Sequence, residues 1–274
     1  MEKLNIFLEH IYEACSQRGK TLPNMLSEAG KMGYTGLECD LWRLDDRELL
    51  RTFSGCGMRA VSVYGQYDLA HDAAGRSAEK MKRHLDTAAY FGAGIILVIP
   101  GFFRPEDDRE SFFGRTCEQL SVLCEMARQY GITVTVEDFD DVNSPCCDTN
   151  GLERLLNGSQ GLRWTFDTGN FAYVLEEPAQ AYSRLRRYLS HVHIKDRSRD
   201  SFRGFTDGSN AKADISGALM YPCECGGGYV GAEQLVKRLI ADGYTGTFSA
   251  EHFGAADQQE YMRRSADNIK GWIK

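Results

Sequence analysis

The chain has 274 residues, of which 42% are hydrophobic and 26% charged, a composition that excludes a disordered or fibrous protein. Its 32 basic and 39 acidic residues leave a formal net charge of −7, opposite in sign to the usual nucleic-acid footprint, so we expect no nucleic-acid partner. No apolar run approaches the ~20 residues that span a bilayer, and Met1–Asn5 lacks the apolar core of a signal peptide, so we expect no membrane association. Nine cysteines, an odd number in a chain that can build a large core, predict a reduced, cytoplasmic protein.

Short strand-like runs alternate with longer amphipathic stretches along the whole chain. The predicted strands are Leu4–Leu8, Thr35–Cys39, Arg59–Tyr64, Gly94–Ile99, Ile132–Val136, Leu162–Phe166, Ser190–Ile194 and Thr247–Ala250. The predicted helices include Thr21–Met32, Asp46–Cys56, Ala74–Phe91, Pro105–Tyr130, Pro178–Tyr188 and Ala232–Asp242. Eight strands, each followed by helical sequence, in roughly 250 residues predict an α/β protein with one (β/α)8 TIM-barrel domain over residues 1–274. An open doubly wound sheet is the alternative, although no G-x-G-x-x-G follows the first strand to support dinucleotide binding.

Glycines punctuate this pattern in two ways. Gly33, Gly131 and Gly243 each close a helical stretch directly before a strand, as left-handed helix caps do. The longest irregular segment, Asp196–Tyr229, is rich in glycine, and we expect it to cover the mouth of the barrel. Its run Gly226–Gly228 fits either a backbone cradle for a phosphate or a flexible lid.

Polar residues alternate with apolar ones in four strands that a helix layer should bury on one face. The four segments are Thr133–Glu137, Arg163–Asp167, His191–Lys195 and Thr247–Glu251. Because side chains two residues apart share a face, each strand directs its polar set to the barrel interior and its apolar set to the helices. Glu38, in the run Gly36–Asp40, is a fifth candidate for the inward set.

Three carboxylates and one imidazole lie at or near the carboxyl ends of these strands, where barrel enzymes build their sites. They are Glu137, Asp167, His193 and Glu251. Buried carboxylates repel one another unless they are paired, protonated or bound to a cation. The set therefore predicts a site for one divalent metal ion (Mn, Co, Mg or Zn). Solvated carboxylates at a loop rim are the alternative.

Several segments resemble the xylose isomerase-like TIM-barrel superfamily, in particular its sugar phosphate isomerase/epimerase branch, over nearly the whole chain. Gly33–Glu38 and Gly243–Glu251 look like the family's "GY.G.E" strand entries, and Val192–Asp196 looks like its "H.H.KD" strand. Asp167–Asn170 is similar to its "D.GN" turn, and Val136–Asp138 falls where a metal-binding glutamate is expected. The resemblance implies the same four metal ligands that the alternation selects.

The resemblance also implies the roles of individual residues. Glu137 and Glu251 would be the catalytic pair of a metal-dependent sugar or sugar phosphate isomerase or epimerase, one removing and one returning a proton through an enediolate. We assign substrate binding to Glu38, Tyr64, Asn170, His191 and Lys195, and for Tyr64 a place in an aromatic rim is the alternative. For His191 a hydrogen-bonded position behind the ligands is the alternative, and for Lys195 an ion pair with a carboxylate. Asn170 stands where 3-epimerases of this type often carry histidine, which leaves the substrate open.

Two other functions fit the same motifs: a lyase or dehydratase acting on inositol-derived ketones or keto-sugars, and a sugar-binding barrel without turnover. Endonuclease IV shares the fold, but its trinuclear zinc site needs further histidines, and the fourth predicted strand ends in Ile99–Gly101 without one. We therefore expect a small-molecule sugar or sugar derivative as the partner, and the sequence leaves a homo-oligomer open.

Overall fold

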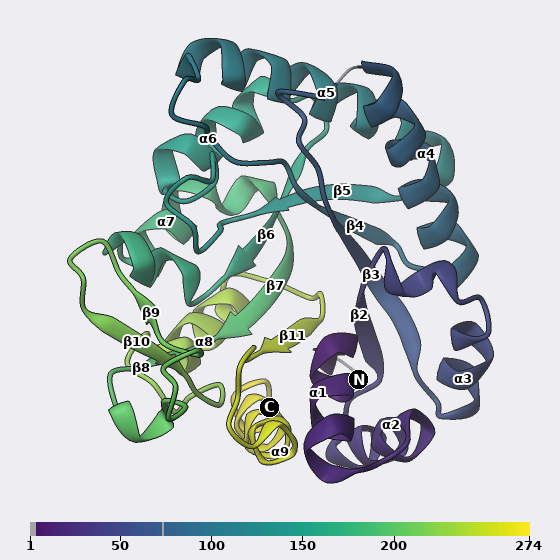
Figure 1. The fold of residues 1–274 in the computed structure, drawn as a ribbon, viewed down its shortest axis with the longest axis vertical. Helices are drawn as coiled ribbons and strands as arrows, with labels where there is room; N and C mark the ends of the chain where they lie inside the picture. The colour runs from purple at the N-terminus through teal and green to yellow at the C-terminus, as the bar shows by residue number, and fades with distance from the viewer. Residues whose placement is uncertain (1–3, 73) are drawn as a thin grey trace.

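Eight parallel strands close into a barrel in the computed structural model, which describes residues 4–72 and 74–274 (Figure 1). Around the ring their order is β1-β11-β7-β6-β5-β4-β3-β2. Their bounds are β1 Leu4–Phe7, β2 Gly36–Asp40, β3 Arg59–Gln66, β4 Ile95–Ile99, β5 Thr133–Glu137, β6 Arg163–Asp167, β7 Leu189–Lys195 and β11 Phe248–Glu251. The predicted (β/α)8 barrel is confirmed, and a closed ring excludes the open doubly wound sheet.

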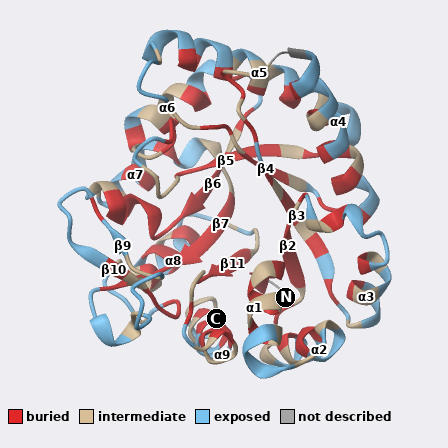
Figure 2. Ribbon diagram, viewed as in Figure 1, coloured by how far each residue is buried: buried red, intermediate tan, exposed pale blue. Residues whose placement is uncertain are grey.

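Helices surround the barrel, with their buried faces toward the strands and their exposed faces outward (Figure 2). They are α1 Leu8–Arg18, α2 Leu22–Met32, α3 Leu49–Gly55, α4 Ala74–Phe91, α5 Arg109–Tyr130, α6 Thr149–Gly158, α7 Pro178–Leu185, α8 Ala232–Ala241 and α9 Gln258–Trp272. Within the described part of the chain, none of them combines the length and apolar character needed to cross a bilayer. The layer thus covers the outside of the barrel and leaves the strand ends for the site.

Local capping signals set the ends of the helices. Helix α5 begins at Arg109 and not at the predicted Pro105, because the Asp108 side chain accepts a hydrogen bond from the Ser111 N–H at 2.8 Å. Its other end is Gly131, whose φ of 67° is left-handed and whose N–H bonds back to the last turn. The predicted glycine cap is therefore confirmed at this position.

The segment predicted to be irregular, Asp196–Tyr229, contains a small antiparallel sheet. Its strands are β8 Arg197–Ser198, β9 Lys212–Ala213 and β10 Leu219–Pro222, in the order β8-β10-β9. Two of the strands have two residues each, which is too short for a periodic pattern to register in sequence. The prediction of an irregular loop was wrong in this respect.

In β5 and β6 the inward side chains are polar and the outward ones apolar, as the alternation predicts. Thr135 of β5 accepts a hydrogen bond from the Thr165 hydroxyl of β6 at 2.8 Å, so the two inward side chains satisfy one another. Val134 and Val136 of the same strand instead lie in the apolar core shared with the helices. This division fixes which strand residues reach the interior.

The outward face of β5 can be tested with Val136, whose side chain is fully buried. Val136→Asp should lower the free energy of unfolding by about 3–5 kcal/mol, because it buries a carboxylate without a partner. Urea denaturation followed by circular dichroism measures this change. Val122→Asp, on the exposed side of α5, is the control and should stay within about 0.5 kcal/mol of the wild type. Equal stability of the two variants would contradict the face assignment.

Candidate metal centre

Four neighbouring strands of the ring bring three carboxylates and one imidazole together. Glu137 ends β5, Asp167 ends β6, His193 lies two residues before the end of β7, and Glu251 ends β11. One ligand atom from each of the four lies within 4.8 Å of the other three. All four side chains are buried. The residues that the sequence selected as metal ligands therefore form one cluster at the carboxyl ends of the strands.

His193 stands at the centre of this cluster. Its Nδ1 atom lies 2.6 Å from Glu137 Oε1 and 3.3 Å from Glu251 Oε2, so this nitrogen faces the carboxylates. The other oxygen of Glu251 lies 2.6 Å from the ammonium of Lys195, which is 4.0 Å from Asp167 Oδ2. Lys195 thus neutralises part of the negative charge and pairs chiefly with Glu251.

The pKa values of the three carboxyl groups reflect this unequal pairing. Burial raises the pKa of Glu137 and raises that of Asp167 well above its usual range. Burial acts in the same direction on Glu251, but Lys195 and His193 outweigh it and hold the pKa of Glu251 below its usual range. One lysine and one histidine therefore leave two of the three acids without enough positive charge.

A divalent cation fits this cluster. Asp167 Oδ1 accepts the N–H groups of Gly169 and Asn170 at 2.7 and 2.9 Å, which fixes the carboxylate in place. Its second oxygen, Oδ2, is buried and has no hydrogen-bond partner among the residues the structure describes. Buried polar atoms without a partner are rare in folded proteins, and bound ions are one cause. Three carboxylate oxygens and one imidazole nitrogen suit Mn, Co, Mg or Zn.

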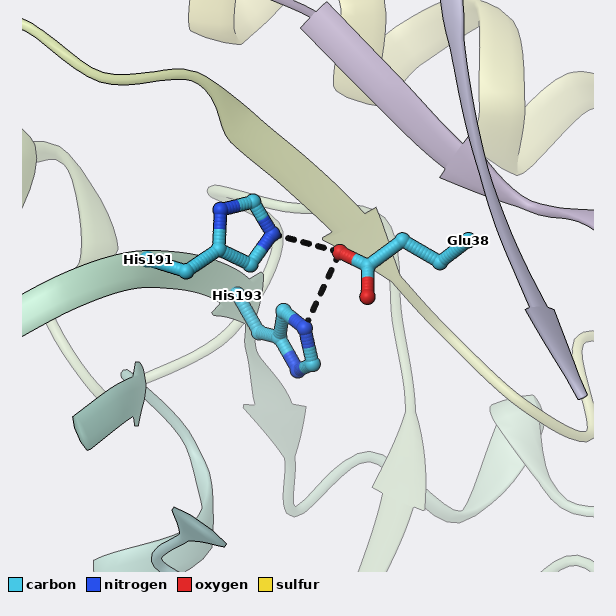
Figure 3. Close-up of side chains that lie close together, drawn as sticks. All are labelled: Glu38, His191 and His193. Atoms are coloured by element: carbon cyan, nitrogen blue, oxygen red, sulfur yellow. Dashed lines mark hydrogen bonds and ion pairs between the residues drawn. The ribbon is translucent and has the colours of Figure 1, made fainter. Parts of the chain in front are cut away.

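Glu38 and His191 lie close to His193 (Figure 3). Glu38 Oε1 lies 2.6 Å from His191 Nε2 and 3.0 Å from His193 Nε2. Burial would raise the pKa of Glu38, but the two histidines hold it well below its usual range. Glu38 therefore orients the His193 ring with Nδ1 toward the other ligands, as carboxylates behind metal-binding histidines do. The hydrogen-bonded alternative for His191 is the one the structure favours.

A cavity of about 470 Å³ opens beside the cluster, within the size range of small-molecule sites. Glu137 and Glu251 line it together with three of the residues predicted to bind substrate, Tyr64, Asn170 and Lys195. Its described lining does not include Glu38 or His191, which hydrogen-bond to each other behind His193, so substrate binding by these two residues stays a prediction. Apolar walls complete the cavity: Phe7, Leu97, Ile99, Phe139 and Phe253.

Asp138, which the sequence did not single out as a site residue, supports the cluster from behind. Its Oδ1 accepts the Trp164 indole N–H at 3.0 Å and the Asp167 backbone N–H at 2.9 Å. Its own carbonyl oxygen accepts the Asn170 side-chain amide at 2.7 Å. Burial raises the pKa of Asp138 well above its usual range. The acidic pair Glu137-Asp138 at the end of β5 could have revealed this role. Asp138 has the parity of the outward-facing residues, and a buried carboxylate there needs hydrogen-bond donors.

The run Gly226–Gly228 does not present its N–H groups to a phosphate. The N–H groups of Gly226, Gly228 and Val230 donate to the carboxylate of Asp196, each at 3.1 Å. A carboxylate of the protein therefore occupies the cradle, and the phosphate interpretation was wrong. The nearby Cys223 and Cys225 are buried free thiols.

A methyl group at Gly228 would collide with Asp196 Oδ1 and the Arg197 carbonyl oxygen. Gly228→Ala should therefore cost about 1–3 kcal/mol of unfolding free energy. Gly114→Ala, in α5 with open space around it, is the control and should stabilise the chain by about 0.5–1 kcal/mol. Chemical denaturation of both variants checks the sign of each change; a stabilised Gly228→Ala would mean that this loop is loosely held.

The comparisons with known proteins agree with this fold. A model of the xylose isomerase-like TIM-barrel family matches residues 26–272. Solved structures with the same fold include 3-keto-D-glucoside 4-epimerase from E. coli (TM-score 0.72, 19% identity, 99% of this chain and 100% of that one). Another is a probable 3-DHS dehydratase from Bacillus anthracis (TM-score 0.75, 14% identity, 98% of this chain and 99% of that one). A third is a xylose isomerase-like TIM-barrel protein from Mycobacterium smegmatis in complex with magnesium (TM-score 0.66, 18% identity, 92% of this chain and 89% of that one).

No functionally curated protein matches the sequence closely enough to count as a relative. The structural neighbours have low sequence identity and establish the fold alone. The family model, by contrast, covers most of the sequence and the whole of the candidate centre. The chain belongs to the xylose isomerase-like TIM-barrel family.

Proposed function

We propose that this chain is a divalent-metal-dependent isomerase or epimerase that acts on a sugar or sugar derivative by proton transfer. One observation carries the proposal: Glu137 and Glu251 belong to the same buried cluster and also line the cavity. A carboxylate can act on substrate only if it reaches the open space, and Asp167 and His193, the other two members, do not line it.

The residues divide the work as follows. Glu137, Asp167, His193 and Glu251 would hold the cation, which would supply a Lewis acid for the substrate's carbonyl oxygen. One of the two glutamates removes the proton from the carbon next to that carbonyl, leaving an enediolate, and the other returns a proton. Lys195, 2.6 Å from Glu251 Oε1, keeps that carboxylate ionised and oriented. Asn170 lines the cavity, where its side chain would contact a substrate hydroxyl.

A dehydratase is the second candidate, because the same buried Lys195 also lines the cavity. An ammonium beside the base can donate a proton to a hydroxyl that leaves after the neighbouring carbon is deprotonated. The dehydratase with the same fold makes this chemistry relevant. The two reactions differ in product: elimination releases water, and epimerisation does not.

The test is to incubate the Mn²⁺-loaded protein with ketoses, aldoses, keto-sugars and inositol-derived ketones in D2O and to record NMR spectra. An isomerase or epimerase exchanges a carbon-bound proton for deuterium and forms an isomer of the same composition. A dehydratase forms an unsaturated product, and this outcome would select the second candidate. Saturable binding without exchange or product would instead make the chain a sugar-binding barrel.

A further inference from the structure

Arg197, at the start of β8, has far more hydrogen-bonding capacity than the protein uses. Its side chain is buried and lines the cavity, where the guanidinium stands 5.1 Å from the centre of the Tyr173 ring. Its polar contact is with Asp140 Oδ2 at 3.5 Å, and its Nε atom is buried without any partner among residues 4–72 and 74–274. A guanidinium carries five donors and stays protonated, so burying it unpaired is costly. The geometry favours an acceptor that enters from the cavity.

A second cation reaches the same place from the small sheet. Lys212 of β9 lies 3.0 Å from Asp140 Oδ1, and it also stands over Tyr173, at 4.9 Å. Lys195 approaches the other oxygen of Asp140 at 3.5 Å but is paired more closely with Glu251. Arg197 and Lys212 therefore share one carboxylate, and this rim of the cavity carries one positive charge in excess.

The ligands of the metal centre do not offset that excess positive charge. The three ligand carboxylates would be balanced by one divalent ion together with Lys195, and Glu38, behind the ligands, lies against His191 and His193. The other charged groups lining the cavity are Glu9 and Asp40, which follow β1 and end β2 on the other side of the ring. The cavity is therefore polarised, with cations after β7 and acids near β1 and β2.

We infer that the substrate carries an anionic group, a carboxylate or a phosphate, that is bound by Arg197 and Lys212; this inference rests on the proposed binding of a sugar derivative at the metal centre. The planar guanidinium matches two oxygens of either anion, and the neighbouring ammonium adds a second charge-assisted bond. Arg197 and Lys195 approach the same oxygen of Asp140, each at 3.5 Å, so the anion lies beside the reacting part of the substrate. Asp140 holds the two rim cations in place without neutralising both.

The experiment compares neutral compounds with their anionic counterparts by calorimetric titration of the Mn²⁺-loaded protein. The pairs are fructose with fructose 6-phosphate and galactose with galacturonate. Inorganic phosphate is a further probe, because its binding does not depend on whether a sugar ring fits the cavity. We expect the anionic member of at least one pair to bind about tenfold more tightly than the neutral one. The pair with the larger difference identifies phosphate or carboxylate as the group.

Variants distinguish anion binding by Arg197 and Lys212 from anion binding by the metal ion. Arg197→Gln should abolish the preference, Arg197→Lys should restore part of it, and Lys212→Gln should reduce it without affecting folding, because Lys212 is exposed. Lys237→Gln, on the outer side of α8, removes the same charge away from the cavity and should change nothing. Circular dichroism checks that each variant is folded.

Equal affinity within both pairs, a preference that survives in Arg197→Gln, or no Arg197-dependent binding of any of the three anions would overturn the inference. Binding is measured without turnover, so the result is separate from the proposed function. An Arg197-dependent anion site without proton exchange would contradict the isomerase or epimerase and leave the anion site standing. Proton exchange with neutral sugars alone would contradict the anion site and support the isomerase or epimerase.

Discussion

Purified protein loaded with Mn²⁺ and desalted should retain about one ion per chain, and the double variant Asp167→Ala/His193→Ala should retain none. The two substitutions remove two of the four ligands and leave a pair of carboxylates that binds a cation weakly. Elemental analysis by mass spectrometry measures the content. Metal should also raise the melting temperature of the wild type, because it binds the folded state, and should not raise that of the double variant.

Asp45→Ala is the control for metal binding. Asp45 is exposed and pairs with Arg83 on the surface, so its loss should leave the metal content at the wild-type value. Stoichiometric metal in the double variant would mean that the cation is held elsewhere in the protein.

Glu137→Gln and Glu251→Gln should each lower turnover on the order of 10²-fold or more, the usual scale for the loss of a general base. Glutamine keeps the size of the side chain and one oxygen ligand, so metal binding should weaken only in part. If one glutamate acts on each face of the substrate, each single variant should still exchange one substrate proton with solvent without completing the reaction. Deuterium incorporation followed by NMR detects this half-reaction.

Glu125→Gln, on the exposed surface of α5, is the matched control and should keep full turnover. A variant at Glu137 or Glu251 that binds metal and turns over at the wild-type rate would remove that glutamate from the mechanism. The proton transfer would then fall to another group that lines the cavity, such as Lys195.

The barrel and the four candidate ligands could be predicted because they depend on strand parity. The alternation in Thr133–Glu137 places Thr135 and Glu137 inside and Val134 and Val136 outside, and the structure has the same arrangement. In a parallel barrel the carboxyl ends of all the strands lie at the same face, where the site is built. The position of a carboxylate at a strand end is therefore predictable from its spacing in the sequence. The role of each residue in catalysis remains a proposal.

The rim of the cavity could not be predicted, because loops and very short strands position it. Arg197 lies beyond the end of β7, where the parity of the barrel strand no longer applies, and its contact with Asp140 joins the short strand β8 to the loop after β5. Lys212 enters through a two-residue strand that has no periodic signal. Glu38 was read as an inward side chain, but its contact with His193 depends on strands on different sides of the ring.

The most direct test of the central claim is the anomalous scattering of a crystal of the Mn²⁺-loaded protein, measured near the manganese absorption edge. We expect one strong peak at bonding distance from Glu137, Asp167, His193 Nδ1 and Glu251, with Glu38 against the opposite nitrogen of the histidine. A fully loaded crystal with no peak between these four side chains, or with its peak bonded to other residues, would contradict it.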